Sequence, residues 1–98
     1  MMIEMKKTDA ATILEVSGRL DTSTAPVLDK KINEDISETT NLVLDLKELA
    51  YISSAGLRVL LSAQKRMQKN GSMKLKNVCE EVMEVFEMTG FADILVIE

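Results

Sequence analysis

The sequence contains no histidine and a single cysteine, Cys79. Without histidine a Ser-His-Asp triad cannot be assembled, and a cysteine protease is excluded for the same reason. A zinc site would have to consist almost entirely of carboxylates, which is unusual for that metal. One cysteine permits no internal disulfide, which fits the reducing cytoplasm in which we expect the protein to remain. An enzyme is therefore the least favoured class, and no metal or other cofactor is expected.

Aromatic residues and positive charge are also scarce. The chain has no tryptophan, one tyrosine and two phenylalanines, and its 16 acidic and 12 basic residues give a net charge of −4. Proteins that bind nucleic acids generally neutralise phosphates with basic residues and stack bases on aromatic rings, so we expect no nucleic-acid partner.

Long apolar runs are missing as well. The longest contain four residues, as at 94–97, whereas a membrane-spanning helix needs about 20. The first residues lack the apolar stretch of a signal peptide. We therefore expect no membrane insertion.

The remaining composition is that of an ordered globular protein. Hydrophobic residues make up 46% and charged residues 29% of the 98 positions, a balance that favours a compact fold over disorder. A chain of this length leaves no room for a second core, so we expect one domain over residues 1–98.

Hydrophobic periodicity predicts alternating strands and helices. Strands are expected at 2–7 and 12–17, with the pattern broken at 18–21, and then at 42–46, 73–76 and 94–97. Helices are expected at 24–37, from the serine pair at 53–54 to about 68, and from an Asn77 cap to Gly90. The order β-β-α-β-α-β-α-β predicts an α/β fold with a small mixed, mainly parallel sheet, helices packed on it and an antiparallel hairpin at one edge.

Two adjacent serines, Ser53 and Ser54, stand where a strand is expected to pass into a helix. A helix N-terminus has unpaired N–H groups and a positive dipole end, so it favours a phosphate, covalent or not. Serine is also a preferred N-cap residue. The pattern alone leaves both interpretations open.

Several segments together resemble the STAS domain family, and most closely its single-domain bacterial anti-sigma-factor antagonists. The residues 51–61, Y-I-S-S-A-G-L-R-V-L-L, preceded by L-V-L-D-L at 42–46, look like the family signature. G-R-L-D at 18–21 resembles the loop after the second strand, and 77–91 resembles the C-terminal helix and turn. The resemblance covers essentially the whole chain.

The resemblance implies a partner switch. A serine-protein kinase that is itself the anti-sigma factor would phosphorylate the antagonist, and a PP2C-type phosphatase would remove the phosphate. The unphosphorylated antagonist would sequester the kinase, so that the sigma factor is affected only indirectly. Alignment on Gly56-Leu57 makes Ser54 the acceptor, while Ser53 occupies a position that is often Asp in other members. Ser53 is the alternative acceptor, because the two hydroxyls are adjacent and only the register separates them.

Further residues are expected to contribute to partner binding. Asp21 and Asp45 match acidic positions that the family places near the phosphosite, although each could also be a structural polar residue. Arg58, four residues after Ser54, is expected on the same helix face, where it could pair with the phosphate or with an acidic patch on the kinase. The complete set of expected partner-binding residues is Asp21, Thr22, Asp45, Ser53, Gly56, Leu57 and Arg58.

Two other functions remain open. The chain could be an accessory STAS subunit of a transporter or lipid-transport complex. It could also be a sensing domain that binds a nucleotide or another small ligand near Ser54.

Overall fold

A computed structural model of the chain describes residues 1–35 and 41–98. In chain order the elements are β1 (Met2–Lys7), β2 (Thr12–Leu20), α1 (Ala25–Asp35), β3 (Asn41–Asp45), β4 (Leu49–Ile52), α2 (Ser54–Asn70), β5 (Ser72–Lys76) and α3 (Glu80–Thr89), followed by a short 3-10 turn, η2 (Phe91–Asp93). Over this described part, none of the helices has the length and apolar character needed to cross a membrane.

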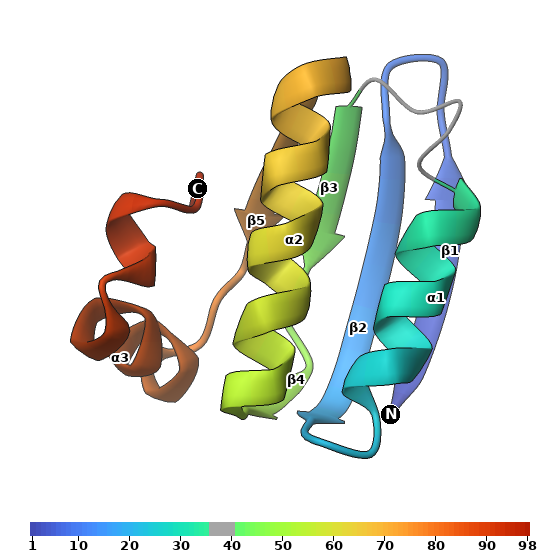
Figure 1. Cartoon of the computed structure of the whole chain (residues 1–98). Coiled ribbons are helices and arrows are strands. Elements are labelled where there is room, and N and C mark those ends of the chain that lie inside the picture. The colour runs from blue at the N-terminus through green and yellow to red at the C-terminus, as the bar shows by residue number, and fades with distance from the viewer. Residues whose placement is uncertain (36–40) are drawn as a thin grey trace.

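The five strands form a mixed sheet in which β2 is the branch point (Figure 1). The order is β1-β2-β3-β5, and β4 also pairs with β2. The first half of β2 pairs with β3 and its last residues, Gly18–Leu20, pair with β4. Among the strands of the described residues, the β1–β2 pair alone is antiparallel. The predicted α/β class with a mainly parallel sheet is confirmed.

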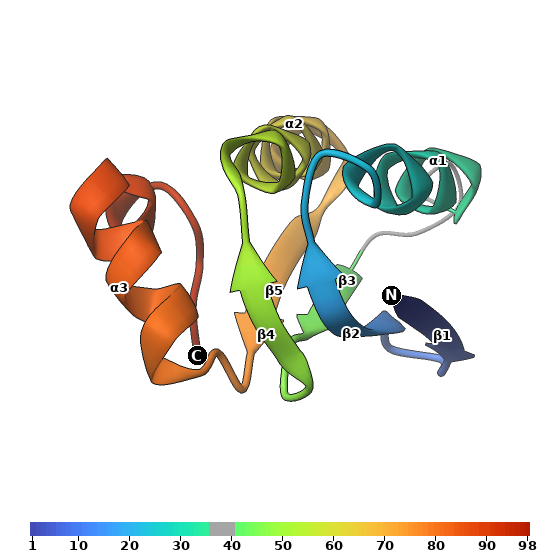
Figure 2. The ribbon, with the colours of Figure 1, turned by 90° about the horizontal axis from the view of Figure 1, so that it is seen from below.

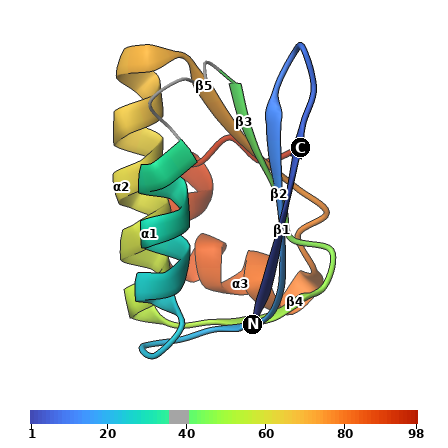
Figure 3. The ribbon, with the colours of Figure 1, turned by 90° about the vertical axis from the view of Figure 1, so that its right-hand side faces the viewer.

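Helices α1 and α2 lie side by side on one face of the sheet, and α3 lies beyond the sheet, near β4 and β5 (Figures 2 and 3). The core lies between α1, α2 and the sheet and continues under α3. Its largest fully buried side chains are Leu14, Leu20, Leu28, Ile32, Leu44, Leu46, Leu49, Leu60, Met67, Met73, Leu75 and Phe86.

No helix among the described residues covers the other face of the sheet (Figure 3), and several residues of this face are charged. The strand register aligns Glu4, Glu15, Asp45 and Lys76 in one row across β1, β2, β3 and β5. Glu15 pairs with the Lys6 ammonium at 2.6 Å. Parallel strands are usually covered by helices on both faces, whereas here the second face carries a row of charged residues instead of a helix.

The sequence patterns missed β4 and misjudged the end of β2. The strand does not break at Gly18, because this glycine adopts φ +89 and the register shifts there, after which the chain continues to pair with β4. In β4 the buried residues are Leu49 and Ile52, with two exposed residues between them. That spacing lacks the period-two alternation by which strands are recognised.

Three other expectations need correction or fall outside the described residues. A strand at 94–97 is wrong: Ile94 is still in a helical turn, and only an isolated bridge joins Ile97 to Leu75. The Asn77 cap is also wrong, since α3 is capped at Cys79. The first helix begins at Ala25, and its expected last residues, 36–37, lie outside the described part.

Candidate functional site

The candidate site lies at the end of the sheet where β4 passes into α2. Leu49 and Ile52 are buried and fix β4 against the core. The Ser53 N–H then donates to the Leu20 carbonyl at 2.8 Å, and the helix begins one residue later. The β2–β4 pairing therefore places the start of α2 directly beside the end of β2.

The two serines have different positions. Ser53 is the N-cap of α2: its backbone is extended, and its hydroxyl oxygen accepts from the Gly56 N–H at 3.4 Å. It is half-buried, whereas Ser54, the first residue of the helix, is exposed. The cap and the exposed hydroxyl, which the pattern left as alternatives, are thus found on two neighbouring residues.

Gly56 and Leu57 hold the first turn of α2 against the sheet. A Cβ atom at Gly56 would lie 2.7 Å from Cγ of Leu20 and 2.9 Å from Cγ1 of Ile52, so only glycine allows this approach. Leu57 is 6% exposed and faces the core. Both residues were expected at a partner surface, but the structure places them inside, where they set the position of the helix.

The electrostatics at this helix end favour an anion. Helix α2 has 17 residues and no acidic residue in its first turn, so the positive end of its dipole is not neutralised from within the helix. The exposed Ser54 belongs to the first turn, whose N–H groups have few partners within the helix. A phosphate on Ser54 would therefore be stabilised where it stands.

Asp21 lies next to this helix end, directly after Leu20, and organises the turn before α1. One carboxylate oxygen accepts from the Ser23 hydroxyl at 2.8 Å and from the N–H groups of Ser23 and Thr24 at 3.0 and 3.1 Å. These hydrogen bonds, that of the Ser23 hydroxyl above all, lower the pKa of Asp21 below its ordinary value. The structure brings Asp21 together with the serines, and it gives Asp21 a turn-forming role.

Thr22 and Asp45 occupy different surroundings. Thr22 is exposed in the same turn as Asp21. Asp45 ends β3 and accepts from the Lys47 N–H at 3.1 Å and from the side-chain amide of Asn77 at 3.0 Å. Because its neighbour Leu44 faces the core, Asp45 points to the helix-free face, opposite the face on which α2 packs. The structure does not group Asp45 with Ser54.

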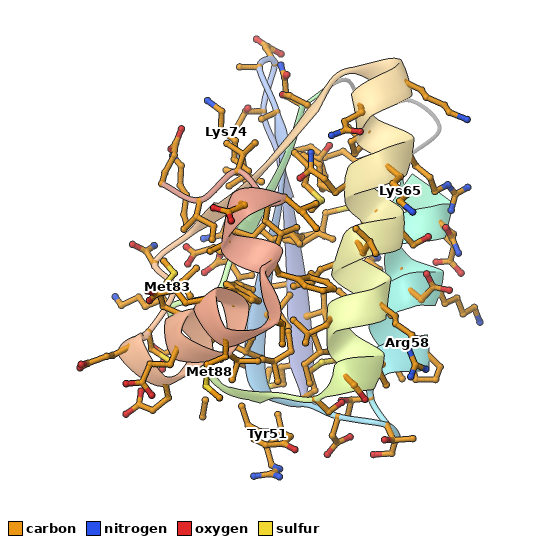
Figure 4. All side chains as sticks on the ribbon, turned by 60° about the vertical axis from the view of Figure 1, so that its left-hand side comes forward. Tyr51, Arg58, Lys65, Lys74, Met83 and Met88 are labelled. Carbon is orange, nitrogen blue, oxygen red and sulfur yellow. The ribbon has the colours of Figure 1, made fainter. Side chains whose placement is uncertain are left out.

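Arg58 lies on the exposed surface of α2, four residues after Ser54. Residues at this spacing are neighbours on a helix surface. Figure 4 shows Arg58 close to the end of the molecule at which α2 begins, with Tyr51 at the same end.

Arg19 and Tyr51 complete the site and were missed from the sequence. The Arg19 guanidinium stacks over the Tyr51 ring, 4.1 Å from its centroid. Its Nε lies 3.8 Å from the outer carboxylate oxygen of Asp21. The two residues face each other across β2 and β4, so only recognition of β4 as a strand could have brought them together.

Comparison with known proteins identifies the family. The sequence model of the STAS domain matches residues 2–98. The anti-sigma-B factor antagonist of Bacillus subtilis is 31% identical over 94 residues, which cover 95% of this chain and 86% of that protein.

Solved structures share the fold. An anti-sigma factor antagonist from Mycobacterium paratuberculosis superimposes with a TM-score of 0.89 at 22% identity, covering 98% of this chain and 83% of that one. SpoIIAA, solved in unphosphorylated and phosphorylated forms, gives TM-scores of 0.82 and 0.76 at 18% identity, covering 99% of this chain and 88% and 91% of those chains. The chain therefore belongs to the STAS domain family and is related to its anti-sigma factor antagonists.

Proposed function

We propose that this chain is an anti-sigma factor antagonist that works in a phosphorylation-controlled partner switch. Its unphosphorylated form binds and sequesters a serine kinase that is itself the anti-sigma factor, and the sigma factor is thereby released indirectly. Phosphorylation of Ser54 dissociates the complex, and a PP2C-type phosphatase restores the binding form. The chain has no catalytic step of its own.

The observation that carries this proposal is the exposed hydroxyl of Ser54 at the first position of α2. In phosphoryl transfer its oxygen bonds to the γ-phosphorus of ATP, the bond to the ADP oxygen breaks, and the hydroxyl proton passes to a base on the kinase. Ser53 is a poorer acceptor because it is half-buried and its oxygen caps the helix.

The physical effect of the phosphate is different in the free protein and in the complex. The group adds about −1.5 to −2 charges, which the helix dipole tolerates, so the free fold is retained. Across an interface the same hydrated anion must be desolvated or must face like charge, which costs several kcal/mol. Since about 1.4 kcal/mol is a tenfold change in affinity, the switch requires no refolding.

The residues around Ser54 divide into two groups in this proposal. Thr22 and Arg58 are exposed at the same end of the molecule and contact the kinase directly, and Asp21 supports the turn that carries Thr22. Asp45 acts at a distance, because it holds the backbone of the segment 46–48 that leads into β4. Gly56 and Leu57 act by positioning α2.

The testing experiment combines phosphosite mapping with binding. The protein is incubated with ATP and lysate of its own cells, and its intact mass is compared with those of Ser54→Ala and Ser53→Ala variants. We expect one added phosphate that is lost in Ser54→Ala and retained in Ser53→Ala. We also expect the unphosphorylated protein, and not the phosphorylated one, to retain a serine kinase on an affinity column.

Other results would favour the alternative functions. Phosphate retained in Ser54→Ala and lost in Ser53→Ala would move the acceptor by one residue. No phosphate in the presence of a retained kinase would contradict the switch. Co-purification with a membrane complex would then favour a transporter subunit, and thermal stabilisation by GTP or ATP without kinase would favour a sensing domain.

A further inference from the structure

Arg19 and Tyr51 form a loosely held pair at the end of the sheet where α2 begins. The guanidinium stacks on the ring at 4.1 Å and its Nε approaches Asp21 at 3.8 Å, near the limit of an ion pair. The Arg19 side chain is 64% exposed, so both contacts compete with water and are weak. The Arg19 guanidinium can therefore leave Tyr51 and Asp21 for a stronger partner at little cost.

The strand register places Arg19 at the end of the sheet where α2 begins. Arg19 faces Tyr51, Leu20 faces Ile52, and the Ser53 N–H donates to the Leu20 carbonyl. Ser54 follows Tyr51 by three residues, so their Cα atoms are at most roughly 10 Å apart. An arginine side chain that turns around the end of the sheet and a phosphate on Ser54 can together bridge such a span. The approach of Nε to Asp21 indicates that the side chain already leans toward this end of β2.

A second guanidinium approaches Ser54 from the helix side. Arg58 lies one turn further along the exposed surface of α2, and Figure 4 shows it at the same end of the molecule as Tyr51. Asp21, in the turn that follows β2, already accepts from three donors. An added phosphate beside Asp21 would meet like charge unless these arginines compensated for it.

We propose that a phosphate on Ser54 draws the Arg19 guanidinium off the Tyr51 ring, so that Arg19 and Arg58 hold the phosphate from two sides. A planar guanidinium donates two parallel hydrogen bonds to phosphate oxygens, a stronger interaction than exposed stacking on a ring. The inference rests on the proposed function only in taking Ser54 as the phosphate acceptor.

This exchange changes the surface that a partner meets. Tyr51 is 40% exposed even beneath the guanidinium, and tyrosine and arginine are the residues that most often anchor interfaces. A kinase that docks on the stacked pair would lose the arginine to the phosphate and find the ring uncovered. Phosphorylation would then alter both the charge and the shape of the docking surface.

The sequence provides a direct probe, because Tyr51 is the one tyrosine of the chain and there is no tryptophan. Phosphoserine is incorporated at position 54 during translation, and the Tyr51 ring resonances are compared by NMR with those of the unmodified protein. We expect phosphorylation to shift them toward the positions found in unmodified Arg19→Ala protein. In Arg19→Ala itself, phosphorylation should move them much less.

The phosphate gives a second readout. The pKa of the second phosphate ionisation is about 6, and paired guanidinium groups lower it because they favour the dianion. Phosphorus NMR should therefore give a higher pKa in Arg19→Ala and Arg58→Ala than in the parent phosphoprotein, by roughly half a unit or more. Lys65→Ala, which removes an exposed cation further along α2, is the matched control and should leave the pKa unchanged.

The inference would be overturned if phosphorylation shifted the Tyr51 resonances equally in the parent protein and in Arg19→Ala. It would also be overturned if the phosphate pKa were the same in the parent, Arg19→Ala and Arg58→Ala phosphoproteins. Because the phosphoserine is introduced without any kinase, these outcomes do not depend on whether the cell phosphorylates Ser54. Failure of the kinase experiment described above would overturn the proposed function and leave this result standing.

Discussion

A Cβ atom on Gly56 would lie 2.7 Å from Cγ of Leu20, a fully buried residue at the end of β2. Because Leu20 is enclosed by the core, its side chain cannot easily move aside. The backbone of α2 at Gly56 therefore packs directly on Leu20, and this contact fixes the first turn of the helix. The position of the Ser54 hydroxyl thus depends on a contact that it does not itself make.

Gly56→Ala should therefore destabilise the protein and displace the acceptor site. We expect a loss of about 1–3 kcal/mol in the free energy of unfolding, as for overpacked cores, together with slower phosphorylation of Ser54. Chemical denaturation and phosphorylation rates measure the two effects. Ser62→Ala, an exposed substitution on the same helix, is the control. If both variants had an equally small effect, the contact between position 56 and Leu20 would not constrain the helix.

Substitutions at the two serines should have different effects: the one at Ser53 should lower stability, and the one at Ser54 should abolish phosphorylation with little effect on stability. Ser53→Ala removes the cap of α2 and should cost about 0.5–2 kcal/mol in the free energy of unfolding. Ser54→Ala alters only an exposed hydroxyl and should stay within about 0.5 kcal/mol. Urea titrations of both variants test this, and a larger loss in Ser54→Ala would reverse the assignment of cap and exposed hydroxyl.

Asp21 should make stability depend on pH in the acid range. Hydrogen bonds from Ser23 and Thr24 lower its pKa in the folded state below the ordinary 3.8. A depressed folded-state pKa contributes stability that is present above the unfolded value and is lost as pH falls through the folded value. In Asp21→Asn this contribution is absent, so the stability difference from the parent should shrink as pH falls from about 5 to below 3. Denaturation across that range measures it, and a constant difference would argue against the assignment.

Asn77 should be sensitive to substitution for two separable reasons. It adopts φ +59, and its amide donates to Asp45 at 3.0 Å. Both Asn77→Gly and Asn77→Ala remove this hydrogen bond, but glycine adopts the left-handed region without strain, whereas alanine has a Cβ and no amide to compensate, which makes it less stable than glycine by about 1–2 kcal/mol. Thermal or chemical unfolding of the pair should rank alanine below glycine, and equal stabilities would mean that the backbone relaxes at this position.

Sequence patterns predicted the parts of the fold that rest on local periodicity. The amphipathic stripe of α2, the serine cap at its start and the stop at Gly90 are all local signals, and all three are found. The strand expected at 94–97 failed because an apolar run does not say whether the chain is extended: Ile94 and Leu95 still bond to Phe91 in a turn.

Contacts between distant segments could not be predicted in the same way. The strand β4 is only four residues long and is defined by its pairing with β2. Arg19 and Tyr51 meet through that pairing, and Asn77 meets Asp45 across β3 and β5. The resemblance to a known family supplied the position of Ser54, but it contained nothing about the stacking of Arg19 on Tyr51.

The uncovered face of the sheet has a consequence for how this sequence can change over time. Along β5, Met73 and Leu75 are buried against the helices, while the alternate residues Lys74 and Lys76 are exposed. Substitutions at the enclosed positions leave cavities or clashes, and those at the charged positions change little. Successive residues of one strand should therefore drift at alternately slow and fast rates, and the helix-free face should diversify long before the fold does.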